Sequence, residues 1–434
     1  MGPVLIHNVF LLPMDGRGVV EDAQVLVRGA EILYAGPAAS LPEGFSPALT
    51  IDGRGGVVMP GLVNCHTHAA MTLLRSYADD LPLMRWLTEA IWPLEDRMDG
   101  EDIYWGTLLA CLEMIRGGVT TFADMYFFMD AAARAVERAG LRASLSRGLI
   151  GNGPAAEKGL AESRELVEKW HGAAGGRITV MLGPHAPYTC PPSYLARVIE
   201  LSGELGVGIH IHVAETLGEM AEIKEKYGTT PVDLLLKTGL LERPVLAAHC
   251  VHAGPEDIAV LADKKVGVAH NPESNMKLGS GIAPVQDMLR AGVRVGLGTD
   301  GAASNNDQDL FGEMRSAAML AKVAAMDPTV LPASRVLHMA TAGGAAALGL
   351  SGTGVLAPGR KADLVLIDIH QPHLIPRHDL SGHLVYAARA SDVALTMVDG
   401  RVLWMDGRFT TLDDEEIMAR AGEKAARLAG TSLK

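Results

Sequence analysis

The chain alternates strand-like and helix-like segments eight times between residues 57 and 300, and this alternation restricts its fold more than any other feature. Apolar runs rich in β-branched residues are each followed by an amphipathic or polar stretch, which predicts an α/β protein with parallel strands joined by helices. Eight such units favour a closed (β/α)8 TIM-like barrel, and an open doubly wound sheet is the alternative. The expected strands are residues 57–68, 120–125, 142–149, 178–185, 208–212, 245–249, 266–270 and 294–300.

Both ends of the chain differ from this middle part. Residues 1–56 contain short strand-like runs separated by Gly, Pro and Asp, and the same pattern returns after residue 354. We therefore expect a small β-sandwich domain formed jointly by residues 1–56 and 355–434, beside a barrel domain at residues 57–354. An exposed helix over residues 413–428 is expected near the C-terminus.

Composition excludes several classes of partner. The chain has 38 Lys and Arg against 51 Asp and Glu, a formal net charge of −13 without a basic run, which argues against nucleic acid and membranes. The alternative explanation of the negative net charge is that it keeps the protein soluble. The apolar runs are too short to span a bilayer, the N-terminus lacks the pattern of a signal peptide, and four scattered cysteines fit free thiols. We therefore expect a cytoplasmic protein.

Histidines and one aspartate stand where the expected strands end. In barrels of this kind, catalytic groups come from the carboxyl ends of several strands. Three imidazoles and a carboxylate, with one position open for water, form a credible catalytic zinc shell. The strand-end residues are His66, His68, His185, His212, His249 and Asp300. Of these, the predicted metal ligands are His66, His68, His212 and Asp300.

The end of the fourth expected strand bears on the number of metal ions. Residues 180–185 read VMLGPH and contain no lysine that, once carbamylated, would bridge two ions. We therefore expect one zinc ion per chain, with iron or another divalent transition metal as the alternative.

Glu215 lies three residues beyond His212 and can reach the same site without binding the metal. A carboxyl group there can move protons beside a water molecule of lowered pKa. The alternative is an ordinary glutamate near the first turn of a helix. His210 should face the same side of its strand as His212, one layer deeper, as a hydrogen-bonded core histidine.

Several stretches resemble the amidohydrolase superfamily. They are residues 60–68 (PGLVNCHTH), 212–215 (HVAE), 248–250 (AHC), 298–301 (GTDG) and 359–365 (GRKADLV). Four more stretches are similar to the group that deaminates 5′-methylthioadenosine and S-adenosylhomocysteine, although other ring hydrolases share much of them. These are residues 77–83, 92–95, 183–188 and 270–275.

The resemblance implies a metal-dependent hydrolase barrel and assigns roles to its residues. Glu215 would handle the proton of a ring nitrogen, His249 would orient the attacking water, and Asp300 would accept a proton from that water. The substrate-binding positions implied in the same way are Glu95, Arg147, His185, Glu215 and Asp300, with Arg147 the least closely matched.

The sequence thus predicts hydrolytic deamination of an adenosine-type nucleoside, such as 5′-methylthioadenosine, S-adenosylhomocysteine or adenosine, to the inosine analogue and ammonia. One alternative is a deaminase or chlorohydrolase acting on guanine, a pterin or a triazine, and a remote one is a non-catalytic barrel scaffold. Glu215 favours deamination, because a protonatable ring nitrogen needs a proton donor. We expect a small-molecule nucleoside as substrate and a homo-oligomer as the assembly.

Overall fold

A closed barrel of parallel strands forms the centre of the computed structural model, which describes residues 2–41, 44–151, 153 and 155–430. Its strands follow one another in chain order, and the last closes the ring on the first by pairing Leu297 with Asn64. The predicted barrel is therefore confirmed, and the open sheet is excluded. The barrel strands are β5 (Leu62–Thr67), β6 (Val119–Tyr126), β7 (Arg142–Leu149), β8 (Ile178–Pro184), β9 (Ile209–Val213), β10 (Val245–His249), β11 (Gly267–His270) and β12 (Arg294–Leu297).

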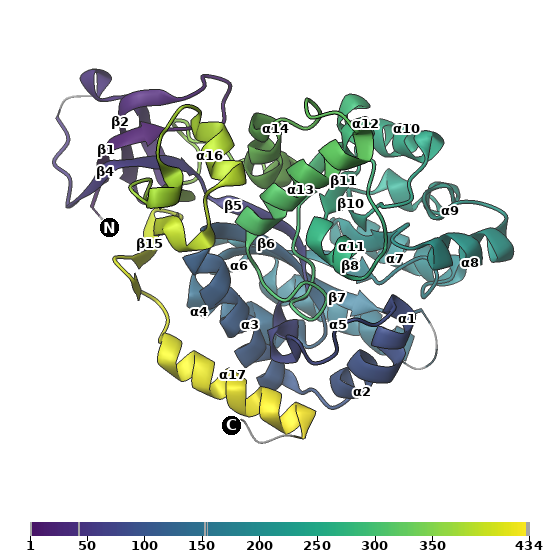
Figure 1. The fold of residues 1–434 in the computed structure, drawn as a ribbon. Coiled ribbons are helices and arrows are strands. Elements are labelled where there is room, and N and C mark those ends of the chain that lie inside the picture. Colours follow the sequence, from purple (N-terminus) through teal and green to yellow (C-terminus); the bar gives the residue numbers. More distant parts are fainter. Residues whose placement is uncertain (1, 42–43, 152, 154, 431–434) are drawn as a thin grey trace.

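Helices surround the barrel (Figure 1). Their apolar faces are rich in alanine, as in α4, where Ala132, Ala135 and Val136 are fully buried. The longer helices between strands are α3 (Gly100–Arg116), α4 (Met129–Ala139), α5 (Ala155–Trp170), α7 (Pro192–Leu205), α8 (Leu217–Tyr227), α9 (Pro231–Thr238), α10 (Pro255–Asp263), α11 (Pro272–Lys277) and α12 (Val285–Arg290). The short helices α1 (Leu83–Arg85), α2 (Trp92–Glu95) and α6 (Ala173–Gly176) also lie between barrel strands. After the last strand come α13 (Leu310–Ala325), α14 (Ala333–His338), α15 (Gly344–Ala347) and, later, α16 (Leu380–Tyr386).

The first expected strand, residues 57–68, proves to be parts of two strands. β4 (Leu49–Pro60) belongs to the second sheet, and β5 begins only at Leu62. Pro60 has no amide hydrogen to continue a ladder, and Gly61 passes so close to Thr120 that a Cβ there would lie 2.1 Å from Cγ2 of Thr120. The break was hidden in the sequence because the residues on both sides of it are apolar and buried.

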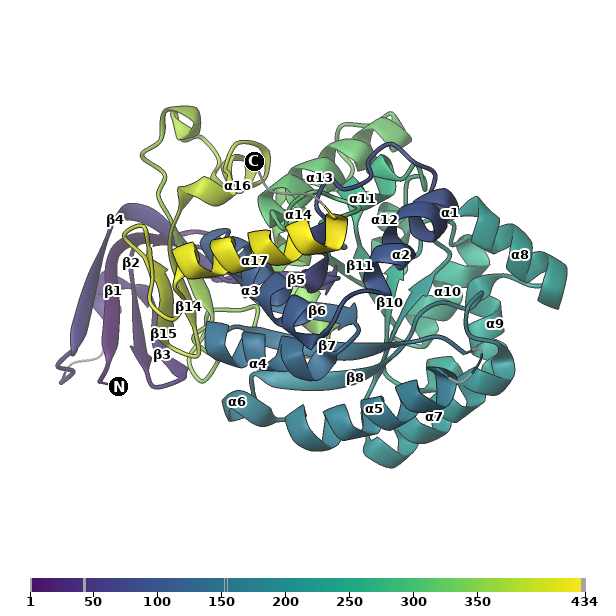
Figure 2. The ribbon, with the colours of Figure 1, turned by 90° about the horizontal axis from the view of Figure 1, so that it is seen from below.

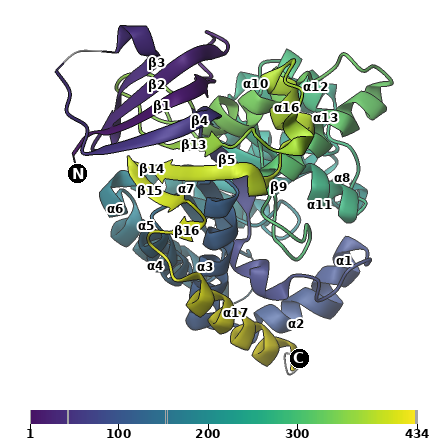
Figure 3. The ribbon, with the colours of Figure 1, turned by 60° about the vertical axis from the view of Figure 1, so that its left-hand side comes forward.

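Strands from both ends of the chain form the second sheet, which is mixed (Figure 3). β4 and β13 pair antiparallel at its middle and so join the N-terminal to the C-terminal strands, as the sequence predicted. Its order is β16-β15-β14-β13-β4-β1-β2-β3. The other strands are β1 (Val4–Leu11), β2 (Val20–Arg28), β3 (Glu31–Pro37), β13 (Leu364–Ile367), β14 (Val393–Val398), β15 (Arg401–Met405) and β16 (Arg408–Phe409).

The expected C-terminal helix is α17 (Asp414–Ala429), and it is less exposed than predicted. It lies along α3 (Figure 2) and buries Ile417, Ala421 and Leu428, which fall on one face of a helix. Arg427 also binds the buried carboxylate of Asp102 on α3. Across the residues that the structure describes, no helix has the length and apolar content needed to cross a membrane.

Candidate active site

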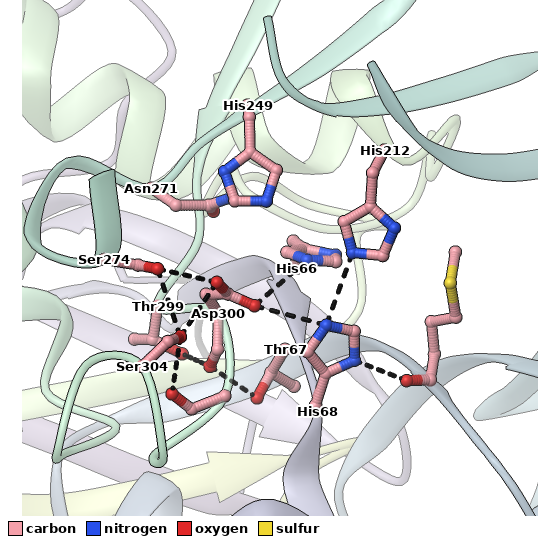
Figure 4. Close-up of polar contacts among 12 residues, drawn as sticks. His66, Thr67, His68, His212, His249, Asn271, Ser274, Thr299, Asp300 and Ser304 are labelled. Carbon is pink, nitrogen blue, oxygen red and sulfur yellow. Dashed lines mark hydrogen bonds and ion pairs between the residues drawn. The ribbon is translucent and has the colours of Figure 1, made fainter. Parts of the chain in front are cut away.

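The four predicted metal ligands converge at the carboxyl end of the barrel (Figure 4). Nε2 of His66 and Nε2 of His68 lie 3.3 and 3.2 Å from Oδ1 of Asp300, and Nε2 of His212 lies 3.3 Å from Nε2 of His68. Ligand atoms around a tetrahedral zinc ion at bond lengths of about 2.0–2.1 Å stand about 3.3 Å apart. These three distances therefore fit a first-row metal ion. Ligand atoms that all lie within 4.8 Å of one another form two overlapping groups, His66 with His68 and Asp300, and His66 with His212 and His249.

The second ring nitrogen of two of these histidines fixes their tautomer. Nδ1 of His68 lies 2.5 Å from the carbonyl oxygen of Met125, and Nδ1 of His212 lies 2.7 Å from that of His185. A carbonyl oxygen only accepts hydrogen bonds, so both Nδ1 atoms carry the hydrogen. Nε2 of each ring keeps its lone pair, which is the form that binds a metal.

His66 is held in a comparable way by another histidine. Its Nδ1 lies 2.8 Å from Nε2 of His210, so the prediction of a hydrogen-bonded core histidine is confirmed. Burial lowers the pKa of His66 to about 4 and that of His210 well below its usual range, so both rings are neutral at pH 7. Among the described residues, Nε2 of His66 has no hydrogen-bond partner and is free to bind a metal.

Asp300 presents one carboxylate oxygen to the histidines and the other to two serines. Its Oδ2 accepts hydrogen bonds from Oγ of Ser274 at 2.7 Å and Oγ of Ser304 at 2.9 Å, which leaves Oδ1 for the site. The residue follows β12 with a φ of 61°, and its N–H donates to the carbonyl oxygen of His66. The two serines were not predicted, because they come from separate segments: Ser274 lies in α11 and Ser304 in a turn after β12.

Glu215 and His249 lie beside the ligand cluster. Oε2 of Glu215 is 3.9 Å from Nε2 of His249, and Nδ1 of His249 is 2.8 Å from Oδ1 of Asn275. Burial raises the pKa of Glu215. Burial alone would lower the pKa of His249, but the carboxylates of Glu215 and Asp300 outweigh it and raise that pKa. Glu215 therefore holds a proton more readily than an exposed glutamate does.

One cavity of about 610 Å³ brings the predicted residues together. His66, fully buried, lies behind its lining. The apolar part of the wall comes largely from the segment between β5 and α3, with Trp86, Leu87 and Trp92. The predicted residues that line the cavity are His68, Glu95, Arg147, His185, His212, Glu215, His249 and Asp300.

The expected substrate-binding residues already have protein partners. Glu95 ends the short helix α2 (Trp92–Glu95) and accepts a hydrogen bond of 2.6 Å from Oη of Tyr126, a residue that the sequence did not single out. Nε of Arg147 donates to Glu162 at 2.8 Å, in the cavity wall. His185 is half-buried, and desolvation of its ring lowers its pKa to about 4 and keeps the ring neutral.

Comparison with known proteins places this arrangement among deaminases. A relative from Pelotomaculum thermopropionicum, named 5-methylthioadenosine/S-adenosylhomocysteine deaminase, is 58% identical over 429 residues and is covered over 99% of both chains. A 5′-deoxyadenosine deaminase of Methanosarcina mazei is 51% identical over 431 residues, again 99% of both chains. The crystal structure of a zinc-bound adenosine deaminase from Xanthomonas campestris superposes with a TM-score of 0.95, at 37% identity and 99% coverage of both chains. The profile of the Amidohydrolase family matches residues 57–403, and the chain belongs to that family.

Proposed function

We propose that the protein hydrolytically deaminates adenosine-type nucleosides to their inosine analogues and ammonia. The position of Glu215 carries this proposal. It is a buried carboxyl group of raised pKa that lines the same cavity as His68, His212 and Asp300. A ring nitrogen of adenine needs a proton donor at such a place, and the names of the similar proteins point to the same substrates.

We infer that one divalent metal ion per chain, zinc first among the alternatives, is held by His66, His68, His212 and Asp300. The short distances that link His66 and His68 to Asp300 and His212 to His68, and the similarity to a zinc-bound deaminase, support this assignment. When bound, the ion supplies Lewis-acid activation of a water nucleophile at neutral pH.

The other steps use side chains of the protein. Asp300 accepts a proton from the attacking water, and His249, whose Nδ1 is fixed by Asn275, orients that water through Nε2. Protonated Glu215 donates to the ring nitrogen next to the amino-bearing carbon, which becomes electrophilic. The water oxygen then adds to that carbon, and ammonia leaves with the proton that Asp300 accepted. The proton left on the added hydroxyl returns to Glu215 as the carbonyl of the inosine analogue forms, so both carboxyl groups regain their starting states.

We assign the substrate contacts to further residues of the cavity wall. Glu95 accepts hydrogen bonds from ribose hydroxyls, His185 contacts the substrate near the ligand cluster, and Arg147 lies further along the wall. The apolar side chains Trp86 and Trp92 exclude water from the bound nucleoside.

Other expectations from the sequence stay predictions. They are the domain boundaries at residues 56/57 and 354/355, a cytoplasmic location, a homo-oligomeric assembly and the absence of nucleic-acid partners. The predicted β domain includes residue 1 and residues 431–434, which lie outside the described residues.

An absorbance screen separates the proposed function from its rivals. The metal-loaded protein would be assayed with 5′-methylthioadenosine, S-adenosylhomocysteine, adenosine, guanine, a pterin and a chlorotriazine. We expect turnover of the nucleosides with release of ammonia. A preference for guanine, the pterin or the triazine would favour the other-ring alternative, and no turnover of any of them would favour a scaffold.

A further inference from the structure

Glu219 is a buried carboxylate in the first turn of α8, and it binds the loop that carries Glu215. Oε1 of Glu219 accepts a hydrogen bond from the N–H of Ala214 at 3.0 Å, and Oε2 accepts one from the N–H of Glu215 at 2.8 Å. Only 4% of the residue is exposed. Neither oxygen contacts a predicted metal ligand, so Glu219 lies outside the site as described so far.

An ordinary helix cap does not account for these contacts. Residues 216–219 read TLGE, the pattern of a capping box, and Oγ1 of Thr216 accepts the expected hydrogen bond from the N–H of Glu219 at 3.2 Å. In a complete box, the glutamate carboxylate would accept from the N–H of Thr216 itself. Here it reaches past Thr216 to the two residues before it, so it binds the catalytic loop.

The loop has a conformation that needs such support. Ala214 has a φ of 51°, in the left-handed region that is unfavourable for alanine. Its carbonyl oxygen accepts a hydrogen bond of 2.9 Å from the N–H of His252, while its N–H and that of Glu215 both point to Glu219. The carboxylate thus satisfies two buried donors at the point where the chain turns Glu215 toward the cavity.

We propose that Glu219 is a positioning residue that fixes the backbone of Glu215 and thereby aims its carboxyl group at the substrate. This inference rests on the proposed function, because it gives Glu215 the role of proton donor. A displacement of about 1 Å at a reacting group can cost about 100-fold in rate. Loss of Glu219 should therefore lower kcat, while substrate binding by Glu95 and the apolar wall of the cavity is preserved.

The first test is Glu219→Gln, with Glu222→Gln as the matched control on the same helix. Glutamine can still complete a capping box, but its amide group offers one acceptor and turns an N–H2 donor toward one of the two backbone N–H groups. We expect kcat to fall about 10- to 100-fold and KM to change little, with metal content near that of the wild type. The thermal midpoint should fall only slightly, because one buried N–H loses its acceptor while the fold is kept. Glu222 is half-buried and pairs with Lys226 at the surface of α8, with 40% of its side chain exposed, so Glu222→Gln should keep wild-type kcat.

The second test asks whether Glu219 acts through Glu215. In a Glu215→Gln background, Glu219→Gln should cause no further loss, because the group that it positions no longer transfers a proton. An equal loss in both backgrounds, a loss of metal or fold, or wild-type kcat in Glu219→Gln would overturn the proposal. All variants are assayed with a substrate that the wild-type protein turns over. If that substrate is not a nucleoside, the proposed function fails, but the role of Glu219 can still be tested.

Discussion

Asp300, Glu215 and Glu95 are among the residues that line the cavity, and their surroundings give these three carboxyl groups different proton affinities. Burial would raise the pKa of Asp300, but the imidazoles of His66 and His68 beside its carboxylate hold that pKa well below its usual range. Burial raises the pKa of Glu215 and of Glu95, and for Glu95 the hydrogen bond from Tyr126 only partly offsets it. Such separation of carboxyl groups by environment distinguishes an ionised ligand from a proton donor.

Removing the proton donor tests this distinction. Glu215→Gln keeps the shape of the side chain but cannot transfer a proton, so we expect turnover to fall about 10²–10⁴-fold. Metal content should stay near that of the wild type, because Glu215 is assigned no coordinating role. Metal analysis and steady-state kinetics on the same preparation check both statements. Loss of metal together with activity would show that Glu215 is a ligand.

Removing the metal tests the ligand cluster. Purified protein should contain about one transition-metal ion per chain, most of it zinc. Dialysis against a chelator should abolish turnover, and added zinc should restore it. His68→Ala, which deletes one Nε2, should lower both metal content and activity. Full activity in protein that elemental analysis proves metal-free would contradict the assignment.

Glu95 tests the nucleoside specificity. A hydrogen bond to a charged group contributes about 1.5–3 kcal/mol, so Glu95→Ala should lower kcat/KM for 5′-methylthioadenosine about 10- to 150-fold. Activity toward a free base such as adenine should change little, because it has no ribose hydroxyls to lose. An unchanged kcat/KM for the nucleoside in Glu95→Ala would show that Glu95 does not bind the ribose.

At the scale of single residues, the sequence predicted the site residues at strand ends better than the residues that hydrogen-bond to the site. His66, His68 and Asp300 were recognisable because each ends a strand-like run at the same edge of the expected barrel. Tyr126 and Glu219 were not, because a buried tyrosine and a helix-start glutamate are common features without function. Their partners are set by backbone turns that the pattern of residue types does not encode.

At the scale of elements, close contacts between backbones decide where small residues are required. β11 passes so near α15 that a Cβ on Gly267 would lie 2.1 Å from the carbonyl oxygen of Ala347. Gly203 in α7 is exposed, and the nearest atom to its ideal Cβ is Nη1 of Arg243, at 3.8 Å. The apolar pattern predicted β11 and α7 alike but not the distance between neighbouring elements.

Substitution of the two glycines by alanine should therefore change the free energy of unfolding in opposite directions. Gly267→Ala should destabilise the fold by about 1–3 kcal/mol, because the backbone of α15 must move. Gly203→Ala should stabilise it by about 0.5–1 kcal/mol, because alanine has less freedom to lose in a helix. Thermal midpoints of the two variants, measured beside the wild type, give the sign directly. A neutral Gly267→Ala would mean that α15 yields to the added methyl group.

At the scale of the whole molecule, a buried ion cluster joins the barrel to the second sheet. Arg142 begins β7, and its guanidinium binds both oxygens of Asp363, at 2.8 and 3.2 Å, and Asp399 at 2.7 Å. The two aspartates lie just before β13 and just after β14. The sequence predicted that the chain ends meet but not this joint, because 221 residues separate Arg142 from Asp363.

Arg142→Met should show how much this joint contributes. The side chains of Arg142 and Asp363 are only 7% and 2% exposed, so the variant leaves a buried carboxylate without its cation. Such a change costs about 3–5 kcal/mol, and the urea midpoint should fall accordingly. Arg164→Met is the control: it removes an arginine whose pair with Glu204 is exposed, which contributes about 0–1 kcal/mol. Equal midpoints for the two variants would mean that the buried cluster adds no net stability, and that apolar packing alone holds the second sheet on the barrel.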